Sequence, residues 1–182
     1  MKKIFPLIIS FIISFQLFAQ QIYPSAGKVI PLKVNDTVPN FELPNETNEL
    51  VNFKQKLIEK PVVLIFYRAG WCPYCNVHLS DIQSIESKIL KLGYQIIAIS
   101  TDRPDKLNET KNKNSLNYTL LSDPNCEIAA KFGIAFWAGD NWKLPVPSLF
   151  IIEKSGKINF VHSDADYKQR ISANDVLSIL KK

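Results

Sequence analysis

The sequence has little cysteine: three residues, Cys72, Cys75 and Cys126, in a chain of 182. Small secreted scaffolds that depend on a disulfide framework need more cysteines than this, so that class of protein is excluded. A chain of this length can also bury enough apolar surface to fold without covalent cross-links. The cysteines are therefore available for chemistry.

Other features are scarce as well. The sequence has two histidines, and a zinc site needs about four ligands. Beside the close pair of cysteines, only Cys126, His78 and His162 could complete such a site. The lysines are scattered and do not gather with aromatic residues, so no nucleic-acid surface is indicated. We therefore expect no metal, no other cofactor and no nucleic-acid partner.

The N-terminus carries the only long apolar stretch. Met1-Lys2-Lys3 is followed by an apolar run from Ile4 to Phe18 and then by Ala19. A basic start, an apolar centre and a small residue before a polar cleavage region are typical of a secretory signal peptide. We therefore expect residues 1–19 to be a signal peptide and the protein to be exported, to the periplasm or beyond, without stable membrane association once the signal is removed. An uncleaved anchor helix is the alternative.

Two further regions follow the expected signal. Residues 20–36 contain Pro24, Gly27 and Pro31 without sustained periodicity, and we interpret them as a spacer. The hydrophobic content of 46% is ordinary for one globular domain, which we place at residues 37–182.

Within this domain, patterns of buried strands alternate with helical patterns. Residues 61–67 and 94–100 are apolar and rich in β-branched residues, as in strands covered on both faces. Between them, apolar residues recur every three or four positions until Gly93, which predicts an amphipathic helix. Further strands are predicted at 40–44, 118–121, 148–152 and 157–161, and further helices at 103–112, at 127–132 and after Ser172. This order predicts an α/β fold, with a central mixed β-sheet flanked by helices on both faces.

The stretch Trp71-Cys72-Pro73-Tyr74-Cys75 lies between the first of these buried strands and the amphipathic helix. Both cysteines should therefore lie at the first turn of a helix, where free N–H groups and the helix dipole stabilise anions. A thiolate is such an anion, and a C-x-x-C pair at a helix start has a lowered thiol pKa. Because the spacing also lets the two sulfurs bond, we predict a redox-active pair. A permanent disulfide and half of a zinc site are the alternatives.

Pro147 stands just before the strand predicted at 148–152. A proline at such a position is a plausible cis residue in a tight turn. The thioredoxin fold has a cis-proline that faces its active-site sulfurs, and residues 144–150 resemble that arrangement. We therefore expect Pro147 to shape the site, with a trans-proline at a strand edge as the alternative.

Three separate blocks, residues 66–76, 99–107 and 118–123, resemble the peroxiredoxin-like (AhpC/TSA) branch of the thioredoxin superfamily, and especially its bacterioferritin comigratory type. The resemblance runs from about Leu32 to the end of the chain. It implies a thioredoxin fold and a thiol peroxidase that reduces hydrogen peroxide and organic hydroperoxides. It also implies recycling by a thioredoxin-like donor, and we expect a monomer or a weak dimer.

In that family's pattern, Cys75 falls at the peroxidatic position, and Cys72 falls where a threonine usually orients the peroxide. Cys72 could then resolve a sulfenic acid on Cys75, since Ser80 stands where some relatives carry their resolving cysteine. The family's arginine is absent near Val146-Pro147, so activation should come from the helix terminus and Arg68. The alternative is a thioredoxin-like oxidoreductase acting on protein disulfides, in which an exposed Cys72 attacks and a buried Cys75 resolves.

Several other residues surround this predicted centre. Trp71 is expected to cover the sulfurs, and residues 136–142 are expected to form a loop beside them. We expect Cys126 to be a packing residue and His78 to be a surface residue, although either could carry or tune a reactive thiol. No role is assigned to the two candidates after the last strand, His162 and Tyr167.

Overall fold

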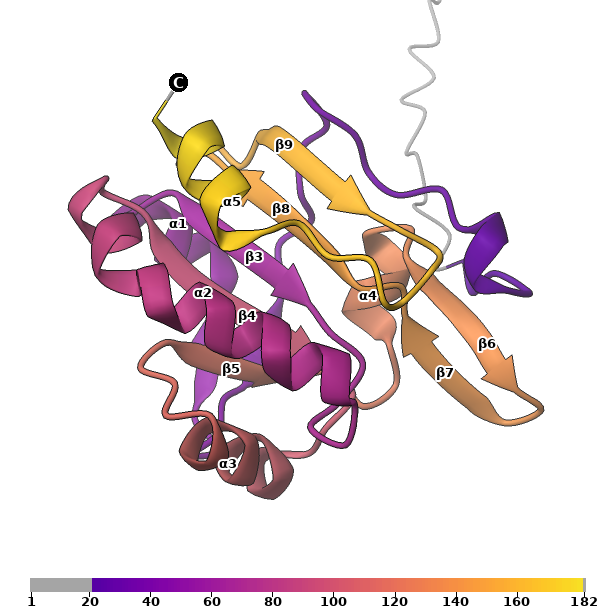
Figure 1. Cartoon of the computed structure of the whole chain (residues 1–182). Coiled ribbons are helices and arrows are strands. Elements are labelled where there is room, and N and C mark those ends of the chain that lie inside the picture. The colour runs from indigo at the N-terminus through magenta and orange to yellow at the C-terminus, as the bar shows by residue number, and fades with distance from the viewer. Residues whose placement is uncertain (1–20, 182) are drawn as a thin grey trace, which may run out of the picture.

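The computed structural model describes residues 21–181, so the predicted signal peptide lies outside the described residues. A five-stranded mixed sheet in the order β5-β4-β3-β8-β9 forms its centre (Figure 1). The strands are β3 (Val62–Phe66), β4 (Gln95–Ser100), β5 (Thr119–Ser122), β8 (Ser148–Ile152) and β9 (Ile158–Ser163). Strands β3, β4 and β5 are parallel, whereas β8 runs antiparallel to both β3 and β9. The predicted fold class is confirmed.

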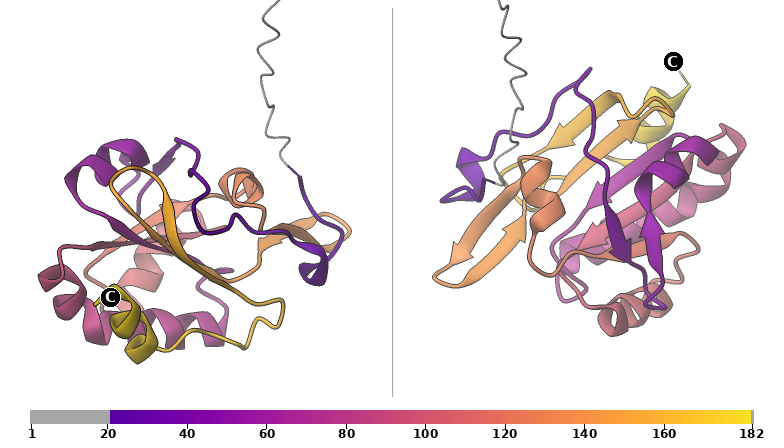
Figure 2. Two further views of the ribbon diagram at one scale, coloured as in Figure 1. Left: turned by 90° about the horizontal axis from the view of Figure 1, so that it is seen from above. Right: turned by 180° about the vertical axis from the view of Figure 1, so that it is seen from behind.

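Helices cover both faces of this sheet, as Figure 2 shows. Helices α2 (Pro73–Lys91), α3 (Pro104–Lys113) and α5 (Ala173–Leu180) pack against one face, and α1 (Phe53–Glu59) and α4 (Glu127–Lys131) against the other. Strand β3 lies between the two layers, because Val63 and Ile65 join one core while Leu64 and Phe66 join the other. Burial on both faces explains why its sequence is continuously apolar.

Helix α2 forms as its sequence pattern predicts. Pro73 occupies its first turn, where the missing N–H costs nothing. Gly93, with φ +87°, ends the helix, and the next N–H bonds back to the carbonyl of Ile89 at 3.2 Å. This is a Schellman motif, in which a left-handed residue is favoured. The helix therefore begins at the cysteine pair and ends just before Gly93.

Two hairpins lie beside the central sheet, and the strand predicted at 40–44 forms the first arm of one of them. β1 (Glu42–Pro44) pairs with β2 (Leu50–Asn52), and β6 (Ala135–Gly139) pairs with β7 (Trp142–Pro145). The prediction of a loop at residues 136–142 is therefore wrong, because most of that stretch forms paired strands. Its short strands are joined by a tight turn at Asp140, and a bulge interrupts their register. Such irregular short strands give a weak alternating pattern in the sequence.

The stretch interpreted as a spacer packs against the domain within the described residues. Tyr23 is buried, donates its N–H to Ala135 at 2.9 Å and accepts from Trp137 at 2.9 Å. A short 3-10 helix, η1 (Ala26–Lys28), follows. Gly133, with φ +72°, approaches this segment so closely that a Cβ would lie 2.1 Å from the carbonyl oxygen of Ile30. The segment is held by these backbone contacts and by apolar side chains at irregular intervals, including Tyr23 and Leu32, which pack against the core.

Within residues 21–181, no helix is long and apolar enough to cross a membrane.

Candidate active site

Cys72 and Cys75 lie just beyond the carboxyl end of β3, at the start of α2. Cys72 is the N-cap, and its carbonyl accepts the N–H groups of Cys75 and Asn76, each at 3.1 Å. Only 1% of each cysteine is exposed, and both thiols are reduced. The exposed Cys72 that a thioredoxin-like mechanism requires is therefore not present.

The two thiols strongly affect each other's pKa. The pKa of Cys72 is lowered to about 6, mainly because the Cys75 thiol donates a hydrogen bond to it, and the charges of Arg170 and Arg68 lower it further. The pKa of Cys75 is raised, because that thiol donates the hydrogen bond to Cys72 and is buried. The pair therefore loses its first proton below neutral pH. Transfer of the remaining proton from one sulfur to the other would place the negative charge on Cys75.

Arg170 faces Cys75 from the segment between β9 and α5. Its Nη2 lies 3.7 Å from the Cys75 sulfur, and its Nη1 donates to the carbonyl of Gln169 at 2.7 Å. A guanidinium at this place favours a thiolate. The sequence analysis missed Arg170, because it lies 95 residues from Cys75 in a polar stretch without periodicity. Arg170 thus adds a second guanidinium to the helix terminus and Arg68, on which the sequence-based prediction relied.

Arg68 follows β3, but its guanidinium does not bond the sulfur. It stacks on the ring of Tyr167, with 4.1 Å from its Cζ to the ring centroid, and lies 6.0 Å from the ring centroid of Phe136. Its backbone N–H faces the Cys75 sulfur and lowers the pKa of that thiol. Arg68 thus contributes a backbone donor, a nearby charge and a contact with Tyr167.

The loop before α2 is fixed by polar contacts. Gly70 donates its N–H to the Asp102 carboxylate at 2.7 Å. Asn76 donates to the carbonyl of Gly70 at 2.8 Å, and Asn114 donates to the Asn76 side chain at 2.8 Å. Burial raises the pKa of Asp102. These bonds attach the cysteine loop to the neighbouring segments around α3.

Pro147 is a trans residue, since residues 21–181 contain no cis peptide bond. The expected cis-proline is therefore wrong. Pro147 is buried in the two-residue connection between β7 and β8, where Val146 donates its N–H to Ile134 at 2.8 Å and accepts from Ser148 Oγ at 2.9 Å. This connection leads directly from the hairpin into the central sheet.

Aromatic side chains surround the cysteine loop. Trp71 is 54% exposed and contacts Trp142 of β7, with 5.4 Å between ring centroids. Tyr74, between the two cysteines, meets Tyr167 edge to face at 5.6 Å. The rings come from three separate parts of the chain, so the tertiary structure assembles them.

With this geometry established, comparison with known proteins identifies the family. The profile of the AhpC/TSA family matches residues 34–161. This chain belongs to the AhpC/TSA family. It is 32% identical over 155 residues to peroxiredoxin Bcp of Escherichia coli strain K12, an alignment that covers 84% of this chain and 97% of that protein. The family resemblance predicted from the three sequence blocks is confirmed.

Solved structures agree with the fold of this AhpC/TSA-family protein. Peroxidoxin BcpB from Mycobacterium tuberculosis superposes with a TM-score of 0.73 at 28% identity, covering 82% of this chain and 97% of the other. Reduced Prx3 from Vibrio vulnificus, in complex with H2O2, gives a TM-score of 0.73 at 18% identity, covering 82% and 96%. The second likeness shows a shared fold.

The remaining candidate residues of this AhpC/TSA-family chain differ in how deeply they are buried. His78 is 5% exposed, so its expected surface position is wrong, and burial together with the charge of Arg170 lowers its pKa to about 4. Cys126 is fully buried, and burial raises its pKa to about 12, which suits a packing residue. His162 is half-buried, and its pKa is lowered by burial. Among residues 21–181, no group of three or more potential ligands could hold a metal ion.

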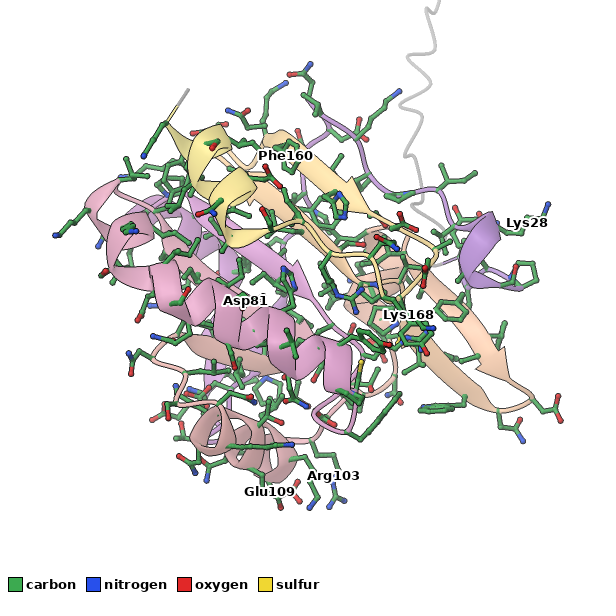
Figure 3. The ribbon with its side chains drawn as sticks, in the orientation of Figure 1. Lys28, Asp81, Arg103, Glu109, Phe160 and Lys168 are labelled. Carbon is green, nitrogen blue, oxygen red and sulfur yellow. The ribbon has the colours of Figure 1, made fainter. Side chains whose placement is uncertain are left out.

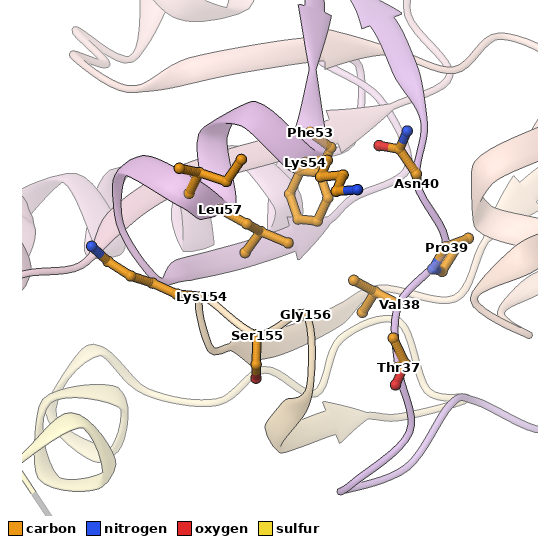
Figure 4. Close-up of a pocket in the computed structure, with 11 residues that line it drawn as sticks. Thr37, Val38, Pro39, Asn40, Phe53, Lys54, Leu57, Lys154, Ser155 and Gly156 are labelled. Carbon is orange, nitrogen blue, oxygen red and sulfur yellow. The ribbon is translucent and has the colours of Figure 1, made fainter.

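A pocket elsewhere in this AhpC/TSA-family protein does not include the cysteines. It has a volume of about 260 Å³ and lies between the segment Thr37–Asn40, α1 and the turn Lys154–Gly156 (Figure 4). Because α1 leads into β3 and this turn follows β8, the pocket lies at the amino end of β3. The cysteines lie beyond the carboxyl end of the same strand, so the pocket is separate from the candidate active site.

Proposed function

We propose that this protein is a thiol peroxidase in which Cys75 attacks the peroxide and Cys72 resolves the product. The observation that carries the assignment of Cys75 is the Arg170 guanidinium, 3.7 Å from its sulfur. Arg170 favours the thiolate, and its charge can also stabilise the oxygen that leaves the peroxide. The family relationship supports the reaction, since the Escherichia coli relative is named a peroxiredoxin.

In the first step, the Cys75 thiolate attacks one oxygen of hydrogen peroxide or of an organic hydroperoxide. The O–O bond breaks, a Cys75 sulfenic acid forms, and the other oxygen leaves as water or alcohol after taking a proton. The sulfur is oxidised by two electrons, and the peroxide is reduced by two.

In the second step, the Cys72 thiol attacks the Cys75 sulfenic acid, which releases water and leaves a Cys72–Cys75 disulfide. Cys72 is the N-cap and has extended backbone angles, so only Cys75 lies within the helix, and C-x-x-C pairs at a helix start form such disulfides. The helix therefore does not need to unwind. We propose that a thioredoxin-like dithiol protein then reduces this disulfide by thiol-disulfide exchange.

The deciding experiment treats the reduced protein with one equivalent of hydrogen peroxide and a sulfenic-acid probe. Wild type should form the Cys72–Cys75 disulfide, whereas Cys72→Ser should accumulate a labelled Cys75. Cys75→Ser should give no rapid label. A rapidly labelled Cys72 in the Cys75→Ser protein would reverse the two roles. If neither cysteine reacts faster than a free thiol while protein disulfides are reduced rapidly, the protein is an oxidoreductase instead.

We also propose that the protein is exported, on the basis of the basic and apolar pattern at residues 1–19. The N-terminus of the protein made by its native host would test this, using mass spectrometry of the cell envelope and medium fractions. A new N-terminus near Gln20 supports export with cleavage. An intact Met1 in a cytoplasmic fraction rejects it.

A further inference from the structure

Residues 164–171, here called the strap, join β9 to α5 and carry Arg170. In Figure 1 the strap runs from β9 toward the start of α2 and the β6–β7 hairpin, then turns back into α5. Lys168, labelled in Figure 3, belongs to the strap, and its Nζ lies 6.0 Å from the centroid of the Tyr74 ring between the two cysteines. The strap thus brings a C-terminal segment against a catalytic centre that is built far earlier in the chain.

Tyr167 makes the strap's aromatic contacts with the cysteine loop. One face of its ring receives the Arg68 guanidinium at 4.1 Å, and the Tyr74 ring meets it at 82° with 5.6 Å between centroids. Arg68 stands just after β3, and Tyr74 lies between the two cysteines. Tyr167 is therefore held by residues on both sides of Cys72.

Two other strap residues also reach α2, since Lys168 Nζ lies 6.0 Å from the centroid of the Tyr74 ring and Ile171 is buried in the same core as Leu79. The hydrogen bonds of the strap are local. Gln169 donates its N–H to the carbonyl of Asp166 at 2.9 Å, and Lys168 donates its N–H to the Asp166 side chain at 3.0 Å. Arg170 bonds the neighbouring carbonyl of Gln169 at 2.7 Å. These bonds give the strap its shape, but they do not attach it to the cysteine loop.

Arg170 itself has no acidic partner among residues 21–181, and its buried Nε makes no hydrogen bond there. An arginine is usually oriented by a carboxylate that accepts its fork of N–H groups. Here the orientation must come from the way the strap packs. Tyr167, three residues before Arg170, supplies that packing against the loop.

We propose that Tyr167 is a positioning residue, which fixes the strap on the cysteine loop so that Arg170 reaches the Cys75 sulfur. The inference rests on the proposed function, because it concerns activation of the same thiol. It gives a role to a residue that the sequence analysis left without one. Tyr167 acts through its ring, so its hydroxyl is not required.

The test measures the pH dependence of alkylation of Cys75 by iodoacetamide in the reduced full-length protein, with the site of reaction read by mass spectrometry. No peroxide is used, so the result does not depend on peroxidase activity. Each variant is made in the wild type and with Cys72→Ser, which leaves Cys75 without its thiol neighbour. The ionisable or charged groups that face the pair or Arg170 come from the segment just after β3, from α2, from β9 and from the strap. They are Tyr67, Arg68, His78, His162, Asp166 and Arg170.

Tyr167→Leu should lower the alkylation rate of Cys75 by about three- to tenfold at pH values well below its midpoint, as expected for a rise of about half to one unit in the pKa of that thiol. Tyr167→Phe should restore the wild-type midpoint. Arg170→Gln should shift the midpoint in the same direction. When Tyr167→Leu is combined with Arg170→Gln, the midpoint should move little beyond its value in the Arg170→Gln protein. Trp137→Leu is the matched control, since Trp137 is 40% exposed and contacts Lys143 at 5.2 Å on the hairpin. It should leave the midpoint unchanged.

The proposal is overturned if folded Tyr167→Leu keeps the wild-type midpoint, or if its effect adds fully to that of Arg170→Gln. Tyr167→Met, which keeps most of the side-chain volume, gives the same comparison if the leucine variant does not fold. A shifted midpoint in a protein without peroxidase activity would leave the role of Tyr167 intact and reject the proposed function. Peroxidase activity in the wild type together with an unshifted midpoint in Tyr167→Leu would support the proposed function and reject the role of Tyr167.

Discussion

Replacing Arg170 with glutamine should weaken the reaction of the reduced protein with hydrogen peroxide. The guanidinium lies 3.7 Å from the Cys75 sulfur and is largely shielded from solvent. A hydrogen bond to a charged group contributes about 1.5–3 kcal/mol, which corresponds to about one to two pKa units. The pKa of Cys75 should therefore rise, and the pKa of Cys72, which the charge of Arg170 also lowers, should move upward from about 6.

The sign of this effect follows from the charge. Arg170 stabilises the thiolate, so its loss raises the thiol pKa, and the defect should be largest at low pH. At pH values well below the pKa of Cys75, the fraction of this thiol present as thiolate should fall about ten- to hundredfold, as expected for a rise of one to two pKa units. Stopped-flow fluorescence of the tryptophans near the site can follow the reaction, with the rate measured from pH 5 to pH 8.

Arg170→Lys provides the control, because it keeps the charge but loses the planar fork of N–H groups. It should retain more activity than the glutamine variant. An Arg170→Gln protein that keeps the wild-type rate at pH 6 and an unchanged pH midpoint would refute the proposed activation of Cys75 by Arg170.

Three further predictions concern the supports of the site. Gly70→Ala should lower thermal stability by about 1–3 kcal/mol, because its Cβ would lie 2.1 Å from Thr110 Oγ1; calorimetry that shows no loss would contradict this. Burial raises the pKa of Asp102 in the folded protein, so the native state holds that proton to higher pH than the unfolded chain does, and this carboxyl makes stability fall as pH rises through that window. Urea titrations between pH 4 and pH 7 give the change in unfolding free energy with pH, and Asp102→Asn should remove the part of this change that comes from Asp102. An identical pH dependence in the variant would show that Asp102 does not cause it. Finally, formation of the Cys72–Cys75 disulfide removes the thiolate that attracts Arg170, so hydrogen exchange of residues 164–171 should be faster in the oxidised protein than in the reduced one. Equal exchange in the two states would mean that Arg170 does not hold the strap.

Much of the scaffold could be predicted from local patterns. The continuous apolar run of β3 requires cover on both faces, and the three- and four-residue spacing of α2 requires one buried side. The position of Cys72 and Cys75 at the start of α2 follows from those two patterns alone. The family resemblance then indicated the chemistry, because its motifs lie in these same segments.

The tertiary structure decided what depends on distant contacts. Arg170 reaches Cys75 across 95 residues, and no spacing in the sequence reports that approach. The trans state of Pro147, the pairing of β6 with β7 and the burial of Tyr23 depend likewise on neighbours that fold against them. The sequence by itself determined where the two sulfurs stand on the chain. Only the folded chain decided which charge faces them and which ring holds that charge in place, because both come from a segment with no periodic pattern of its own.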